Sequence, residues 1–123
     1  MTRIPTSVPF VDFQPMHQPI QKQIEQAVQN VLSRGDFILG QAVTEFEAEF
    51  AKACGASLGV GVACGTDAIA LGLRACGIGA GDEVLVPANT FIASVIGILH
   101  AGATPVFVDC DPKTKNIDPS KIE

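Results

Sequence analysis

The sequence predicts an α/β fold in which two amphipathic helices precede a β-α-β-α-β succession with parallel strands. Two observations support this prediction. Apolar residues recur at helical spacing in the first half of the chain, and short valine-rich runs alternate with helical stretches in the second half. Strands that alternate with helices pair in parallel through right-handed crossovers. Because three such strands leave open edges and half-covered faces, we expect the sheet to be incomplete.

Composition narrows the class of protein. The chain has 123 residues, of which 47% are hydrophobic and 17% charged, so it is long enough for one domain and too apolar to be disordered. Its formal net charge of -5 comes without a basic run, which argues against nucleic acid and membrane surfaces as partners. The four cysteines form no Cys-x-x-Cys pair and the N-terminus lacks a signal-peptide core, so we expect a reducing, cytoplasmic location.

The first 55 residues divide into an arm and two helices. Residues 1–19 contain four of the eight prolines, which predicts an extended arm. Residues 20–55 then carry two helical patterns, the first stopped by Gly35 and the second by Gly55. The loop between them, Gly35–Gly40, contains three large apolar side chains in a row.

Residues 56–123 carry the β-α-β-α-β pattern. Small and β-branched residues predict a buried strand over 58–63, and the elements expected after it are a helix over 66–76, a strand over 83–87, a helix over 91–100 and a strand over 104–108. Asp118 and Pro119 are then a good N-cap and first position for another helix, which the sequence begins but does not complete. We therefore expect the chain to be the N-terminal portion of a larger domain.

The turn Cys64-Gly65-Thr66-Asp67 is the strongest candidate for a ligand site. It follows a predicted strand and opens a helix, where free backbone N–H groups and the helix dipole favour an anion. Gly65 allows close approach of the backbone, and Thr66 adds a hydroxyl donor. The alternative is that Thr66 only caps the helix and Gly65 only turns the chain.

Two further turns lie at the same predicted edge of the sheet. Phe91, at a helix start, is placed to stack on a flat ligand, or else belongs to the core. Asp109 and Asp111 follow the last strand and are most simply turn residues, although Asp-x-Asp followed by Thr114 distantly resembles the magnesium-dependent haloacid-dehalogenase-type phosphatases. The two histidines have no neighbouring ligands, so we expect no metal site.

Taken together, several segments closely resemble the opening of the DegT/DnrJ/StrS aminotransferases. The resemblance runs from about residue 11 to the last residue and keeps the order and spacing of the family's motifs, which here read Gly-Asp-Phe-Ile-Leu-Gly, Cys-Gly-Thr-Asp-Ala, Gly-Asp-Glu-Val, Pro-Ala-Asn-Thr-Phe and Gly-Ala-Thr-Pro-Val-Phe-Val-Asp. These are pyridoxal-phosphate enzymes of fold type I that mostly aminate keto sugars attached to nucleotides. The resemblance thus implies the N-terminal part of the large domain of such an enzyme.

The resemblance also assigns roles to residues. Gly65 and Thr66 would hold the phosphate of pyridoxal 5'-phosphate, Asp67 would open the helix, and Phe91 would stack on the pyridine ring. The Gly35–Gly40 loop matches a segment near the dimer interface and the active site, which implies a homodimer. Cys64 replaces the serine usual before Gly-Thr, a change that removes one hydroxyl contact.

The family's catalytic lysine, which binds the cofactor as a Schiff base, has no counterpart here. None of the lysines of this sequence matches its position; they are Lys22, Lys52, Lys113, Lys115 and Lys121. We therefore assign no catalytic residue and expect the chain alone to be inactive. The parent enzyme would transfer an amino group, with glutamate as donor, to a keto sugar nucleotide in polysaccharide or secondary-metabolite biosynthesis. The alternative is a non-catalytic short chain that acts as a binding or assembly module.

Overall fold

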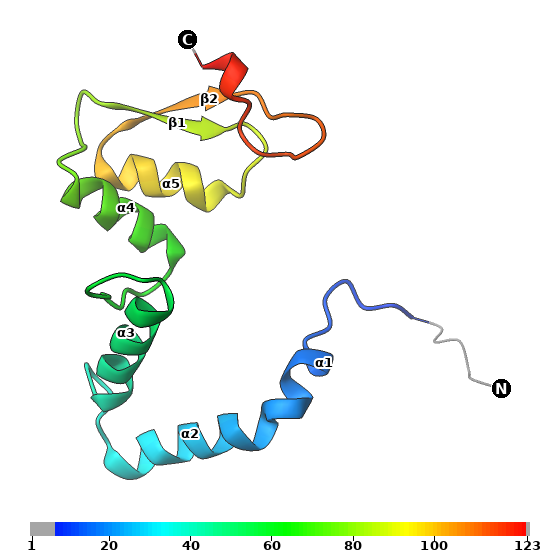
Figure 1. Ribbon diagram of the computed structural model, residues 1–123, viewed down its shortest axis with the longest axis vertical. Helices are drawn as coiled ribbons and strands as arrows, with labels where there is room; N and C mark the ends of the chain where they lie inside the picture. Colours follow the sequence, from blue (N-terminus) through cyan, green and yellow to red (C-terminus); the bar gives the residue numbers. More distant parts are fainter. Residues whose placement is uncertain (1–6, 123) are drawn as a thin grey trace. The chain divides into compact units, whose positions relative to one another are not determined.

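The computed structural model describes residues 7–122, and the chain divides into two compact units, Met1–Gly59 and Val60–Glu123. Figure 1 shows that the regular elements described in the first unit, over residues 7–59, are all helices and that the second unit contains both strands. The two units are described separately below. No helix within residues 7–122 is long and apolar enough to cross a membrane.

The first unit contains two longer helices that confirm the predicted pair. They are α2 (Gln21–Arg34) and α3 (Gln41–Ala53), and α2 ends at Gly35, whose φ of 72° suits a residue without a side chain. The prediction of an extended arm over 1–19 is wrong for its last residues, which form α1 (Gln14–His17) and the 3-10 turn η1 (Gln18–Ile20). A proline stands near the start of each turn, where its missing N–H costs no helical hydrogen bond. Residues 1–6 of the arm lie outside the described residues.

The loop between α2 and α3 is organised by Asp36. Its carboxylate accepts a hydrogen bond from the Gln41 backbone N–H at 2.8 Å and lies 3.2 Å from Nε of Arg34. The Gln41 N–H, helped by the Arg34 guanidinium, lowers the pKa of Asp36 below its ordinary value. The ionised carboxylate therefore closes the loop onto the first turn of α3.

This interaction predicts a pH dependence of the loop. Because the pKa of Asp36 is lowered in the folded chain, its stabilising effect is present above the ordinary aspartate pKa of about 3.9 and is lost as the pH falls through the lower, folded pKa. We expect the protection factor of the Gln41 amide, which corrects for the pH dependence of intrinsic exchange, to fall as the pH is lowered through the folded pKa of Asp36. Asp36→Asn should produce the same protection loss at pH 6, and equal protection in this variant and the natural chain would contradict the assignment.

The predicted strand over 58–63 is not a strand in the structure. Residues 56–59 instead run back along α3, so closely that a Cβ atom on Gly59 would lie 2.6 Å from the backbone oxygen of Glu47. The sheet of the described chain contains only two strands, and this segment is not one of them. A strand buried on both faces is defined by its neighbours, and the apolar pattern that predicted it does not specify them.

From its first helix onward, the second unit has the alternating pattern that the sequence predicts. Its elements are α4 (Gly65–Ala75), β1 (Glu83–Pro87), α5 (Ile92–Ala101), β2 (Thr104–Val108) and the 3-10 turn η2 (Pro119–Lys121). Strands β1 and β2 pair in parallel, from Glu83 opposite Thr104 to Pro87 opposite Val108, and both match the predicted ranges. Asp118 caps η2 by accepting the Ser120 N–H at 2.9 Å, as its sequence position predicts.

The core of this unit lies between the two strands and α5. Val86, Ile98 and Ala103 are its buried centre, and partly buried apolar residues pack around them; these are Leu73, Ile78, Val84 and Val95. Figure 1 shows α5 next to the strands and α4 beyond it on the same side. The second unit is thus layered as sheet, α5 and α4, so that α5 fixes the position of α4.

Candidate functional site

The first turn of α4 presents uncapped backbone N–H groups. Cys64, the N-cap residue, has an extended backbone, and its side chain makes no capping hydrogen bond to the helix. The first α-helical hydrogen bond of the turn runs from Ala68 N–H to the Cys64 oxygen, so the N–H groups of Gly65, Thr66 and Asp67 point out of the helix end. Together with the positive end of the helix dipole, they form a set of donors suited to an anion.

The absence of a side chain at Gly65 leaves the space in front of these donors open. A Cβ atom built on Gly65 would meet no heavy atom within 4 Å. Because Cα–Cβ bonds tilt towards the N-terminus of a helix, any side chain here would lean over the end of α4. Thr66 and Asp67 are half-buried beside it. The arrangement fits a phosphate group that binds against bare backbone.

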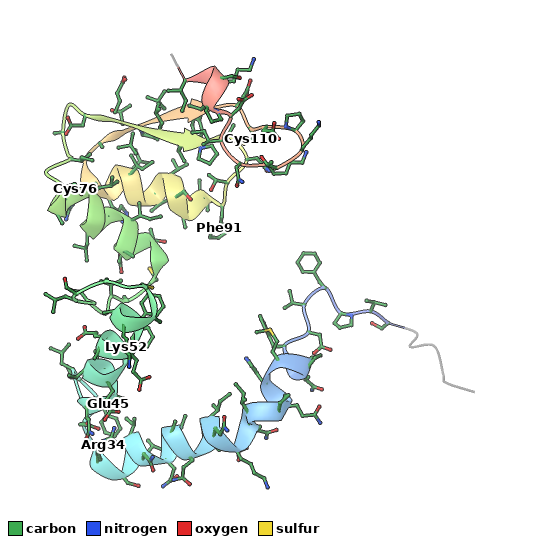
Figure 2. The ribbon with its side chains drawn as sticks, viewed as in Figure 1. Arg34, Glu45, Lys52, Cys76, Phe91 and Cys110 are labelled. Carbon is green, nitrogen blue, oxygen red and sulfur yellow. The ribbon has the colours of Figure 1, made fainter. Side chains whose placement is uncertain are left out.

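Phe91 lies at the start of the neighbouring helix. It is the N-cap residue of α5, its side chain is 78% exposed, and Figure 2 shows the ring pointing away from the strands. The alternative that Phe91 belongs to the core is therefore excluded for this unit. The loop before it donates two hydrogen bonds, from Ala88 N–H to the oxygen of Val108 at the end of β2 (2.8 Å) and from Asn89 N–H to Sγ of Cys110 in the turn after β2 (3.4 Å).

Packing of α5 against α4 brings the two candidate positions into one unit. Gly97 of α5 lies against Thr66 and Ile69 of α4. Phe91 precedes Gly97 by six residues, which corresponds to about 9 Å along the helix axis. The uncapped turn of α4 thus packs against Gly97 of α5, and the exposed ring of Phe91 lies about two turns of α5 away from this contact.

The acidic turn after β2 has a structural role. The Asp111 carboxylate accepts hydrogen bonds from the backbone N–H groups of Lys113 at 2.9 Å and Thr114 at 2.7 Å, and these bonds lower its pKa. Asp109 contributes its backbone oxygen, which accepts the Asp118 N–H. No group of three His, Cys, Asp or Glu side chains within residues 7–122 is placed to hold a metal ion.

Sequence reasoning missed two contributors to the site. In the sequence, Gly97 cannot be distinguished from any small residue in an apolar helix, and Cys110 is a single cysteine between two aspartates. Both act through partners more than 20 positions away in the sequence, Ile69 and Asn89. No local pattern of residue types could have indicated these contacts.

An uncapped helix end beside an exposed aromatic ring, in an α/β unit with parallel strands, is an arrangement suited to a phosphorylated ligand. Comparison with known proteins identifies the family. Residues 18–123 match the model of the DegT/DnrJ/EryC1/StrS aminotransferase family. The chain belongs to this family, and its α/β fold corresponds to the N-terminal part of such enzymes.

Relatives and solved structures agree with this assignment. The chain is 52% identical over 116 residues to dTDP-3-amino-3,6-dideoxy-alpha-D-galactopyranose transaminase of Aneurinibacillus thermoaerophilus, covering 94% of this chain and 32% of the relative. It matches Streptomyces venezuelae DesV in complex with a ketimine intermediate at 41% identity and a TM-score of 0.85, covering 93% of this chain and 31% of the other. It also matches Bacillus subtilis NtdA with bound cofactor PMP at 34% identity and a TM-score of 0.88, covering 98% of this chain and 28% of the other.

These matches also define the extent of the likeness. The chain spans about a third of the length of the curated relatives that it matches. The likeness therefore covers the uncapped turn, the Phe91 loop and the two strands, together with the helices before them.

Proposed function

We propose that this chain forms the phosphate-binding part of a pyridoxal-phosphate-dependent sugar aminotransferase. The observation that supports this proposal most directly is the uncapped turn Gly65-Thr66-Asp67 in a chain of this family. The relatives include a UDP-N-acetyl-3-dehydro-alpha-D-glucosamine 3-aminotransferase and a dTDP-3-amino-3,4,6-trideoxy-alpha-D-glucose transaminase. A keto sugar attached to a nucleotide is accordingly the proposed substrate class, and glutamate the proposed amino donor.

In the proposed enzyme, the residues of this chain bind and orient the cofactor. The N–H groups of Gly65, Thr66 and Asp67, with the Thr66 hydroxyl, would hold the phosphate, and Phe91 would stack on the ring. When bound, pyridoxal phosphate withdraws electrons from the carbon that carries the migrating amino group. A fixed phosphate and a stacked ring restrict the cofactor to one orientation, which is how this part of the chain contributes to rate.

The remaining parts of the reaction lie outside this sequence in our proposal. None of the five lysines matches the family's catalytic position, so we propose that the lysine comes from a segment beyond residue 123 and that residues 1–123 alone do not transaminate. We further propose a cytoplasmic homodimer. Phe37, Ile38 and Leu39 support this proposal because they are three consecutive large apolar side chains on one loop, exposed by 66%, 88% and 83%.

Replacement of Gly65 by alanine tests the proposed site. The variant is made in the natural polypeptide that carries this sequence, and we expect unchanged folding because the methyl group would meet no heavy atom of the described chain within 4 Å outside its own helix backbone. It would occupy the space that the phosphate needs, and loss of charge-assisted hydrogen bonds worth about 1.5–3 kcal/mol corresponds to an affinity for pyridoxamine 5'-phosphate that is tenfold or more lower. Fluorescence or absorbance titration measures the affinity, and the transfer of the glutamate amino group to a keto sugar nucleotide measures the activity.

Gly72→Ala is the matched control, because Gly72 lies on the same helix and a Cβ atom there also meets nothing within 4 Å. It should bind the cofactor like the natural protein and gain about 0.5–1 kcal/mol of stability from the higher helix propensity of alanine. Equal affinities in the Gly65 and Gly72 variants would contradict the proposed phosphate site. A natural protein that binds pyridoxamine 5'-phosphate but transfers no amino group would contradict the proposed activity.

A further inference from the structure

The contact between α5 and the first turn of α4 is closer than side chains allow at one position. Gly97 is buried in α5, and a Cβ atom built on it would lie 2.7 Å from Cγ2 and 2.8 Å from Cβ of Ile69. The same Cβ atom would lie 3.1 Å from the backbone oxygen of Thr66. The two helices therefore meet where one of them has no side chain, and the meeting point is the turn that carries the proposed phosphate donors.

Neither neighbour of Gly97 can move aside by a simple rotation. The Ile69 atoms at issue are its Cβ and a branch of it, and a β-branched side chain in a helix is nearly restricted to one χ1 rotamer. The Thr66 oxygen belongs to the backbone. A methyl group at position 97 would thus have to push α4 away by about 0.7 Å to restore ordinary van der Waals contact.

The position of the Thr66 oxygen matters because of peptide geometry. The Thr66 carbonyl and the Asp67 N–H belong to one planar peptide group, so a force on the oxygen rotates or shifts the N–H with it. That N–H is one of the three that point out of the end of α4. At the opposite end of α4, Arg74 donates a hydrogen bond to the backbone oxygen of His100 on α5. Contacts with α5 at both ends of α4 therefore oppose a displacement of the whole helix.

We propose that Gly97 is a positioning residue for the cofactor phosphate. It lets α5 support the Thr66–Asp67 peptide directly, and it thereby sets the distance between the phosphate donors on α4 and Phe91 at the start of α5. This inference rests on the proposed function, since it assumes that the turn binds the cofactor. Gly97 lies outside the binding turn, yet in this proposal it fixes where the N–H donors of the turn lie relative to the ring of Phe91.

The test compares two ligands in the natural polypeptide that carries this sequence. The ratio of the dissociation constant of pyridoxamine to that of pyridoxamine 5'-phosphate isolates the contribution of the phosphate. We expect Gly97→Ala to lower this ratio about tenfold, with a shifted phosphorus NMR signal of the bound ligand, while Gly72→Ala keeps both as in the natural protein. A decrease of less than twofold in a folded Gly97→Ala protein would overturn the inference.

A second variant decides the question if Gly97→Ala does not fold. The exchange Gly97→Ala with Ile69→Gly removes the collision with Ile69 and leaves the methyl group against the Thr66 oxygen alone. We expect this protein to fold and its ratio to be about threefold lower than that of the natural protein; a natural ratio would overturn the inference. A ratio near one in the natural protein itself would contradict the proposed phosphate site, which separates failure of the proposed function from failure of this inference.

Discussion

Alanine at position 40 is expected to open the loop between α2 and α3. The backbone of Gly40 has ordinary angles, with φ of -76°, so the obstacle is steric: a Cβ atom would lie 2.0 Å from the backbone oxygen of Asp36 and 2.8 Å from its carboxylate. The loop must move, and the hydrogen bond from Gln41 N–H to Asp36 is lost with it. We expect a loss of about 1–3 kcal/mol of stability, the usual cost of overpacking.

Hydrogen exchange along α3 measures this effect, because the first turn of the helix should lose its protection while the second unit keeps its own. Gly79→Ala is the control. Gly79 also lies in a loop, but a Cβ atom there meets only the Ala101 oxygen at an ordinary 3.6 Å. We expect its stability to remain within about 0.5 kcal/mol of the natural chain. Unchanged protection of α3 in Gly40→Ala would show that the loop does not depend on this close approach.

Replacement of Ile98 by alanine should be the most destabilising of the substitutions considered. Ile98 is 3% exposed and packs with Val86 and Ala103 at the centre of the second unit. Loss of its buried side chain leaves a cavity between α5 and the strands, and such changes cost about 2–5 kcal/mol. Since small domains are stable by only about 5–15 kcal/mol, we expect the second unit to unfold at a clearly lower urea concentration.

The neighbouring residue supplies the control for this experiment. Leu99 has the same number of carbon atoms as Ile98 but is 55% exposed in this chain, so Leu99→Ala should cost less than about 1 kcal/mol. Circular dichroism during urea unfolding compares the two variants. Equal losses in both would indicate that the core does not lie where the structure places it.

Most elements of the fold could be predicted because their signals are local. The strands 83–87 and 104–108 are short β-branched runs bounded by turns, and the helices end at glycines within a residue or two of the predicted positions. The prediction of a strand over 58–63 was wrong because a buried strand forms only beside partner strands, which a local sequence pattern does not identify. The prediction of an extended arm over 1–19 was wrong for residues 14–19, because proline, which breaks a helix in its interior, is well suited to the first turn of a helix.

The candidate site was predictable to the same extent. Its donors follow one another along the chain, so Gly65, Thr66 and Asp67 could be assigned to a helix start that the structure confirms. The exposure of Phe91 could not be predicted, because the same residue at the same spacing also suits a core. The proposed role of Gly97 could not be predicted for a different reason. It depends on the distance between Gly97 on α5 and Ile69 on α4, and only a structure provides that distance.

The parallel pairing of β1 with β2 also bears on how this chain acquires its fold. Glu83 lies opposite Thr104, so the ladder closes a segment of about two dozen residues, with α5 as its connection. Closing so short a segment costs little chain entropy compared with pairing strands far apart in sequence. We therefore expect β1, α5 and β2 to form a folding nucleus during synthesis, as soon as Val108 has left the ribosome.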